Sequence, residues 1–156
     1  MSVAIIDYGV GNLFSLASSL HYLGVEAKVT AKAADLQAAD RLILPGVGAF
    51  GDAAAKLRES GLFEVVRQQA AAGKPLLGIC LGMQLLFDKS LEYGEHAGLG
   101  LIGGTVEALQ SDLSAYASTE SSFGLKVPHI GWNSLHILRD DPLFSYFKDG
   151  EYVYYV

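Results

Sequence analysis

The chain contains little cysteine, few basic residues and no long hydrophobic run. Cys80 is the only cysteine among 156 residues, so no disulfide can form within the chain, which fits a reducing compartment. The 17 acidic residues outnumber the 11 basic ones, and the basic ones do not cluster, which argues against binding to nucleic acid or an anionic membrane. No apolar stretch is long enough to cross a bilayer, and Asp7 interrupts the apolar N-terminus, so no signal peptide is expected. These observations predict a cytoplasmic protein.

The remaining composition is that of a protein with a sizeable core. Hydrophobic residues make up 51% of the chain and charged residues 18%, which excludes a disordered chain. Neither an internal repeat nor a linker is present. The length favours a single domain over residues 1–156.

The first half of the chain alternates apolar runs with segments of helical spacing. Strands are expected over 3–6, 25–30, 41–44 and from 76 onward, and helices over 13–23, 33–39 and 52–72. Asn12 is a plausible N-cap of the first helix, Gly24 its stop, and a break or bend is expected near Ser60 and Gly61. This alternation predicts an α/β fold with a flavodoxin-like, doubly wound, mostly parallel sheet, whose sites lie at the carboxyl ends of its strands.

The second half has a different character. After Asp88 the chain is polar and rich in glycine, and residues 111–122 are expected to form a loop. Short strands are expected over 105–109, 134–138 and 152–156. Tight turns between short strands indicate an antiparallel extension of the sheet.

The lone cysteine lies in a distinctive segment. Gly78 and Gly82 stand two residues on either side of Cys80, after an apolar run and before a helical pattern in which Leu81, Leu85 and Leu86 could share a face. This arrangement is typical of a nucleophile elbow, a sharp strand-to-helix turn that exposes its nucleophile. The dipole of the following helix would favour a thiolate. A buried cysteine that packs as a small hydrophobe is the alternative, and the paired glycines argue against it.

Two glycine-rich loops follow other strands. Gly9 and Gly11 suggest a dinucleotide fingerprint, but Phe14 stands at the third glycine position, which disfavours nucleotide binding. Residues 45–51 form a loop that could aim backbone N–H groups at an anion and so serve as an oxyanion hole. An ordinary connection between a strand and a helix is the alternative for this loop.

Four segments together resemble one family, the class I (triad) glutamine amidotransferases. They are residues 7–12, 44–50, 78–87 and 128–133, and they occur in the family's order along the whole chain. The segment around Cys80 alone would indicate only an amidotransferase. The first and last segments are most similar to a glutaminase subunit that supplies ammonia to a cyclase subunit in histidine biosynthesis.

The resemblance implies a mechanism and a set of site residues. Cys80 would attack the side-chain amide of glutamine and release ammonia through a glutamyl thioester. The oxyanion hole would comprise backbone N–H groups of Val47, Gly48 and Leu81. Gly48, Gln84 and Glu92 would bind the glutamine, with the Glu92 carboxylate against its ammonium group. No cofactor is implied, and no spacing of side chains suggests a metal site.

The resemblance also implies a partner. The cyclase subunit, a (β/α)₈ barrel, would form a heterodimer with this chain and receive the ammonia. The residues expected to face that partner are Asn12, His129, Trp132 and Asn133.

One element of the family's pattern is missing. The family completes its triad with a histidine and a glutamate two residues apart near the C-terminus, and none of His21, His96, His129 and His136 matches that motif. The resemblance therefore implies a domain that lacks its C-terminal part and is a very poor glutaminase as it stands. The alternatives are a catalytically incompetent amidotransferase-like binding module, the amidotransferase subunit of another biosynthetic enzyme, or another cysteine hydrolase that uses the same elbow.

Overall fold

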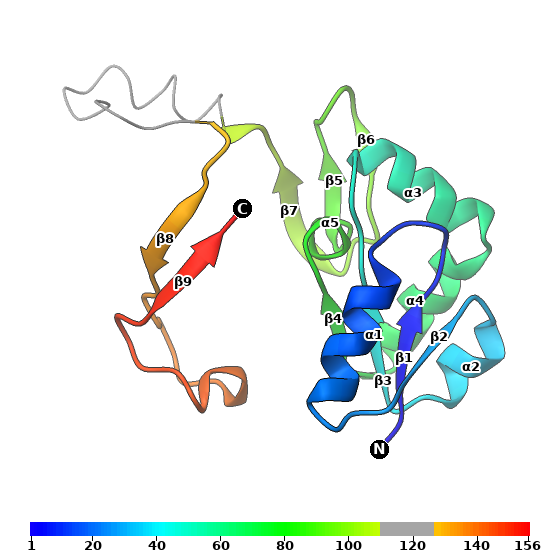
Figure 1. Cartoon of the computed structure of the whole chain (residues 1–156). Coiled ribbons are helices and arrows are strands. Elements are labelled where there is room, and N and C mark those ends of the chain that lie inside the picture. Colours follow the sequence, from blue (N-terminus) through cyan, green and yellow to red (C-terminus); the bar gives the residue numbers. More distant parts are fainter. Residues whose placement is uncertain (110–126) are drawn as a thin grey trace. The chain divides into compact units, whose positions relative to one another are not determined.

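The computed structural model describes residues 1–109 and 127–156, which belong to two compact units, Met1–Glu107 and Ala108–Val156 (Figure 1). The loop expected over 111–122 lies outside the described residues. Among the helices that are described, none has the length and apolar character needed to cross a membrane.

The first unit is built on a four-stranded parallel sheet. Its strands, in the spatial order β2-β1-β3-β4, are β2 (Ala27–Thr30), β1 (Val3–Ile6), β3 (Arg41–Leu44) and β4 (Leu76–Gly78). Val3 aligns with Ala27 on one side and Arg41 on the other, and Leu42 aligns with Leu76. The winding reverses between β1 and β3, which is where a crevice opens at the carboxyl ends of such sheets. The predicted α/β fold with a mostly parallel, doubly wound sheet is confirmed.

Four helices connect and cover these strands. They are α1 (Leu13–Tyr22), α2 (Ala33–Ala38), α3 (Phe50–Glu59) and α4 (Leu62–Ala71). The Asn12 side chain caps α1 by accepting a hydrogen bond of 3.2 Å from the Ser15 N–H, as expected. The helix predicted over 52–72 is broken into two at the expected place, because Gly61 between them adopts a left-handed conformation with φ 74° that no α-helix can continue through.

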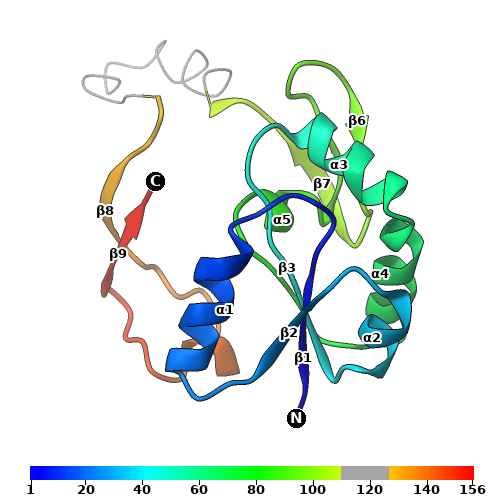
Figure 2. The same ribbon diagram turned by 45° about the vertical axis from the view of Figure 1, so that its right-hand side comes forward.

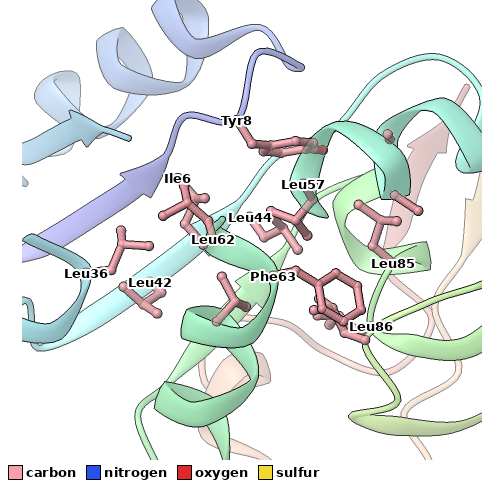
Figure 3. Close-up of a cluster of buried hydrophobic side chains, with 14 of the residues drawn as sticks. Ile6, Tyr8, Leu36, Leu42, Leu44, Leu57, Leu62, Phe63, Leu85 and Leu86 are labelled. Carbon is pink, nitrogen blue, oxygen red and sulfur yellow. The ribbon is translucent and has the colours of Figure 1, made fainter. Parts of the chain in front are cut away.

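The alternation of side chains along each strand gives the sheet two apolar faces. Figures 1 and 2 show α1 on one face and α2, α3 and α4 on the other. Ile6 and Leu44 point toward α3 and α4 and are fully buried among Leu57, Leu62 and their neighbours (Figure 3). Burial of one such leucine contributes about 1.5–3 kcal/mol. This core packs against the carboxyl ends of β1 and β3 and against Leu76 at the start of β4.

A short helix and a second small sheet follow β4. They comprise α5 (Leu81–Gln84), β5 (Phe87–Ser90), β6 (His96–Ala97) and β7 (Ile102–Val106), with β5 antiparallel to β6 and parallel to β7. The helical pattern expected after Cys80 to include Leu85 and Leu86 ends at Gln84 instead. The carbonyl of Leu85 accepts from the Leu99 N–H at 2.8 Å and that of Leu86 from the Leu101 N–H at 2.8 Å, so neither continues the helix. Leu81, Leu85 and Leu86 are nevertheless all buried.

The described part of the second unit contains a two-stranded antiparallel sheet. Strand β8 (Gly131–Ser134) pairs with β9 (Tyr152–Tyr155), and a 3₁₀ turn, η1 (Pro142–Phe144), lies between them. Antiparallel pairing thus occurs between β5 and β6 and between β8 and β9, in sheets separate from the four-stranded parallel one, whereas the strand expected over 105–109 is β7, which is parallel to β5. The strand expected over 134–138 ends at Ser134 instead. Beyond it the Ile137 N–H is bonded to the Asp149 carboxylate at 2.7 Å and not to a strand.

Candidate active site

Cys80 stands at the turn between β4 and α5 in an unusual backbone conformation. Its φ is 53° and its ψ −120°, and its side chain is exposed. A non-glycine residue in such a conformation costs about 1–3 kcal/mol, which the surrounding structure must offset. Two backbone hydrogen bonds of 2.9 Å close the turn, from Gly82 to Ile79 and from Met83 to Cys80. The sharp strand-to-helix turn expected at Cys80 is therefore present, with its thiol open to solvent.

The two flanking glycines are required by close packing. A Cβ at Gly78 would lie 2.5 Å from the Met83 Cα, and a Cβ at Gly82 would collide with the Leu44 carbonyl oxygen. Both contacts are with backbone that cannot move aside without disturbing β3 or α5. The residue pattern around Cys80 thus reflects the steric needs of this turn.

The loop after β3 lies directly against the Cys80 turn. A Cβ at Gly46 would be 2.7 Å from the Gly82 nitrogen and 2.9 Å from the Leu81 Cβ. Pro45 and Gly46 are buried, whereas Val47 and Gly48 are exposed, and Gly48 has a φ of 93° that favours glycine. The structure therefore brings the expected oxyanion loop beside the cysteine.

Leu81 supplies the first N–H of α5, next to Cys80. The following N–H groups, of Gly82, Met83 and Gln84, donate to the Ile79 and Cys80 carbonyls. Within the described residues the Leu81 N–H has no such backbone acceptor, as is normal at the start of a helix. Because α5 has only four residues, few peptide dipoles align behind Cys80, and the expectation of dipole assistance to a thiolate has little support.

The two other expected substrate-binding side chains come from α5 and from the turn after β5. Gln84 is half-buried at the end of α5. Glu92 is also half-buried, and its Oε2 accepts a 2.7 Å hydrogen bond from the Phe50 N–H at the start of α3. The Glu92 N–H in turn donates to the Oγ of fully buried Ser90 at 3.0 Å. Glu92 is thus bound to the first residue of α3, where the loop after β3 ends, and Gln84 lies on the same short helix that Cys80 precedes.

Tyr8 is a residue of this region that sequence reasoning missed. It follows β1, its side chain is 5% exposed, and its hydroxyl donates a 2.8 Å hydrogen bond to the Pro45 carbonyl. Burial raises the pKa of Tyr8 to about 12, so the hydroxyl keeps its proton at neutral pH. The available signal was an aromatic residue inside the polar, glycine-rich loop that ends the first strand.

The four histidines have other roles or positions. The His96 ring packs directly on Gly51, where a Cβ would lie 2.7 Å from its Cε1, and His96 is half-buried. His21 is exposed in the last turn of α1, at the opposite end of that helix from the site. His136 lies 3.5 Å from the Asp149 carboxylate in the second unit.

The expected partner-facing residues belong to both units. Asn12 caps α1 in the first unit. In the second unit the His129 Nε2 lies 3.1 Å from the Asn133 Oδ1, and Trp132, 66% exposed, makes an edge-to-face contact with Tyr154 on β9 with ring centroids 5.3 Å apart.

Comparison with known proteins gives consistent matches. The family described as "Glutamine amidotransferase class-I" matches residues 4–156. A relative from Wolinella succinogenes named "Imidazole glycerol phosphate synthase subunit HisH" is 47% identical over 99% of the chain and 72% of its own length. Proteins of the same name from Lactiplantibacillus plantarum and Aquifex aeolicus are 49% and 45% identical, over 98% and 100% of the chain and 68% and 70% of their own lengths.

Solved structures agree with the sequence relatives. The crystal structure of a glutamine amidotransferase superposes on 85% of the chain and 62% of its own length, with a TM-score of 0.62 and 26% identity. A peptidase E-like protein from Listeria monocytogenes shares the fold at 16% identity, with a TM-score of 0.53 over 65% of the chain and 62% of its own length. The chain thus spans about 70% of the length of its sequence relatives and less of its structural ones.

Proposed function

Because the chain belongs to the class-I glutamine amidotransferase family, we propose that it is the glutaminase subunit of imidazole glycerol phosphate synthase. In this role it hydrolyses glutamine and passes the ammonia to a cyclase subunit in histidine biosynthesis. The observation that carries the proposal is the exposed Cys80 with its positive φ, packed against the loop after β3. Both compact units belong to one amidotransferase domain on this proposal, since the family match runs through residues 4–156.

Cys80 is the nucleophile of the proposed reaction. Its Sγ attacks the side-chain amide carbon of glutamine, and the carbonyl oxygen becomes an oxyanion. The backbone N–H groups of Leu81 and of the loop residues Val47 and Gly48 stabilise that charge, a contribution worth about 10²–10³ in rate per donor. The proton of the thiol passes to the amide nitrogen, which leaves as ammonia, and water then hydrolyses the glutamyl thioester to glutamate and restores the Cys80 thiol.

The substrate is held on the same edge of the sheet. Gly48 presents backbone without a side chain, so the glutamine can approach the loop closely. Gln84 offers amide hydrogen bonds, and the Glu92 carboxylate offers a charge that suits the substrate's ammonium group. Because the Glu92 Oε2 already accepts from the Phe50 N–H, its Oε1 is the oxygen that faces the substrate on this proposal.

The proposed partner is a cyclase subunit, a (β/α)₈ barrel that forms a heterodimer with this chain. The residues that contact it on this proposal are Asn12 and, in the second unit, His129, Trp132 and Asn133. Exposed aromatic residues such as Trp132 are enriched at interface hot spots. A shared interface would place the ammonia source next to the enzyme that consumes it.

The test is covalent labelling followed by an ammonia assay. A diazoketone analogue of glutamine should label the protein once, at Cys80, and Cys80→Ala should abolish labelling. In a complex of the cyclase subunit with a form of this protein that also carries the histidine and glutamate of the family's triad, Cys80→Ala should abolish glutamine-dependent cyclisation and leave cyclisation with added ammonium salts intact.

Other results of these two experiments would favour a different assignment. Labelling at another residue, or glutamine-dependent turnover in Cys80→Ala, would refute the assignment of the nucleophile. Absence of labelling with intact binding to the cyclase subunit would favour a catalytically incompetent binding module. Stimulation by the partner of a different biosynthetic enzyme would favour the amidotransferase subunit of that enzyme.

A further inference from the structure

The loop between β3 and α3 is fastened at both ends by side chains from distant parts of the chain. At its start the Tyr8 hydroxyl donates to the Pro45 carbonyl at 2.8 Å, and at its end the Phe50 N–H donates to the Glu92 Oε2 at 2.7 Å. The residues between these two anchors include the exposed Val47 and Gly48. These two hydrogen bonds therefore limit how the peptide groups between them can rotate.

The Tyr8 anchor lies where the loop meets the Cys80 turn. A Cβ at Gly46 would approach the Tyr8 hydroxyl oxygen to 3.0 Å and the Gly82 nitrogen to 2.7 Å. The first peptide of the loop is thus enclosed between the Tyr8 hydroxyl and the backbone that follows Cys80. Gly11, from the same loop as Tyr8, supports it from another side, since a Cβ there would be 3.1 Å from the Pro45 ring.

We propose that Tyr8 is a positioning residue for the oxyanion hole: its hydroxyl holds the Pro45 carbonyl and so orients the following N–H groups of Val47 and Gly48 toward the atom attacked by Cys80. This inference rests on the proposed function. Tyr8 itself touches neither substrate nor nucleophile. Without the hydroxyl, the buried Pro45 carbonyl has no hydrogen-bond donor, which costs free energy. A rotation of the loop that exposes this carbonyl to water would reduce that cost.

The first measurement compares ligands that do and do not need the oxyanion hole. The Cys80 thiol adds to the aldehyde of glutamate γ-semialdehyde and gives a thiohemiacetal. An S–C bond forms to the aldehyde carbon, and the thiol proton passes to the carbonyl oxygen. That oxygen occupies the oxyanion position. Glutamate binds without forming this adduct, and iodoacetamide alkylates the thiol by displacing iodide, with no oxyanion.

Tyr8→Phe is the test variant because it removes the hydroxyl and keeps the ring. We expect its affinity for the semialdehyde to fall about tenfold or more, with glutamate affinity and the rate of Cys80 alkylation unchanged. Thr30→Val is the matched control. The Thr30 hydroxyl is also buried and donates to the Asp35 carboxylate at 2.6 Å, at the end of β2, which β1 separates from β3. Its removal should leave semialdehyde affinity unchanged.

Amide hydrogen exchange separates positioning from general destabilisation. In Tyr8→Phe the exchange of Gly46, Val47 and Gly48 should accelerate while that of core residues such as Val66 does not. Unchanged semialdehyde affinity in Tyr8→Phe, an equal loss in Thr30→Val, or faster exchange throughout the core would each overturn the positioning role. A wild-type protein that binds no semialdehyde at Cys80 would overturn the proposed function itself, and the role of Tyr8 with it.

Discussion

Gly82 shows how a single position is constrained by backbone that is remote in sequence. It lies in α5 with its Cα against the end of β3, and a side chain there would strike the Leu44 carbonyl. The same carbonyl accepts the Ile79 N–H at 3.0 Å, which ties β3 to the strand that leads into Cys80. The Leu44 carbonyl at the end of β3 therefore contacts both sides of the turn that holds Cys80.

Gly82→Ala is expected to lower the free energy of unfolding by about 3 kcal/mol or more, because the added methyl must displace β3 or α5. Gly61→Ala is the matched control, since a Cβ there meets nothing within 4 Å and the cost is only that of the left-handed conformation, about 1–2 kcal/mol. Urea unfolding followed by circular dichroism measures both. Equal losses in the two variants would show that the close approach at Gly82 does not limit stability.

At the scale of elements, the β8–β9 pair combines a regular ladder with an exposed aromatic pair. Trp132 lies opposite Tyr154 in the register, and their rings meet edge to face. Such a pair stabilises a hairpin by about 0.5–1.5 kcal/mol beyond its buried area. Trp132 is nevertheless 66% exposed, which leaves most of its surface for the partner that we propose.

Trp132→Ala is expected to raise the dissociation constant for the cyclase subunit at least tenfold, because truncated aromatic anchors of interfaces typically cost more than about 1.4 kcal/mol. Trp132→Phe keeps an aromatic ring and should recover part of the affinity. Tyr146→Ala, which removes a side chain that is 97% exposed, is the control for loss of a surface aromatic. Unchanged affinity in Trp132→Ala together with a lower melting temperature would assign Trp132 to hairpin stability alone.

At the scale of the whole molecule, the buried apolar side chains are unevenly distributed. Among the described residues every one of them lies between Val3 and Leu99, within the first unit. The described part of the second unit has backbone pairing and aromatic contacts but no buried apolar side chain. Since apolar burial supplies most of the favourable free energy of folding, the two units differ in their capacity to fold alone.

A chain of residues 1–107 is expected to unfold cooperatively and to keep the Cys80 turn. Urea titration and the alkylation rate of Cys80 are the measurements. Leu44→Ala in this shortened chain should cost about 2–5 kcal/mol, because it leaves a cavity in the main core. A segment of residues 108–156 should show no cooperative transition. A gradual, non-cooperative unfolding of residues 1–107 would contradict this view of the first unit.

The local sequence was sufficient for much of the fold. Strands β1 and β3 have the predicted bounds, the chain breaks at Gly61, and Cys80 occupies the expected turn. Each of these features depends on neighbours in sequence: a short apolar run, a glycine that can adopt a positive φ, and two glycines that allow close packing. Interactions of this range can be inferred from spacing alone.

Tertiary structure alone decided the rest. The hydrogen bonds from Tyr8 to Pro45 and from Phe50 to Glu92 join residues 37 and 42 positions apart, and no local pattern specifies them. Helix α5 ends at Gln84 because the carbonyls of Leu85 and Leu86 are taken by a later segment, although their spacing favours a longer helix. Amphipathic spacing determines which side chains are buried, but the partners of backbone groups depend on which distant segment packs against them.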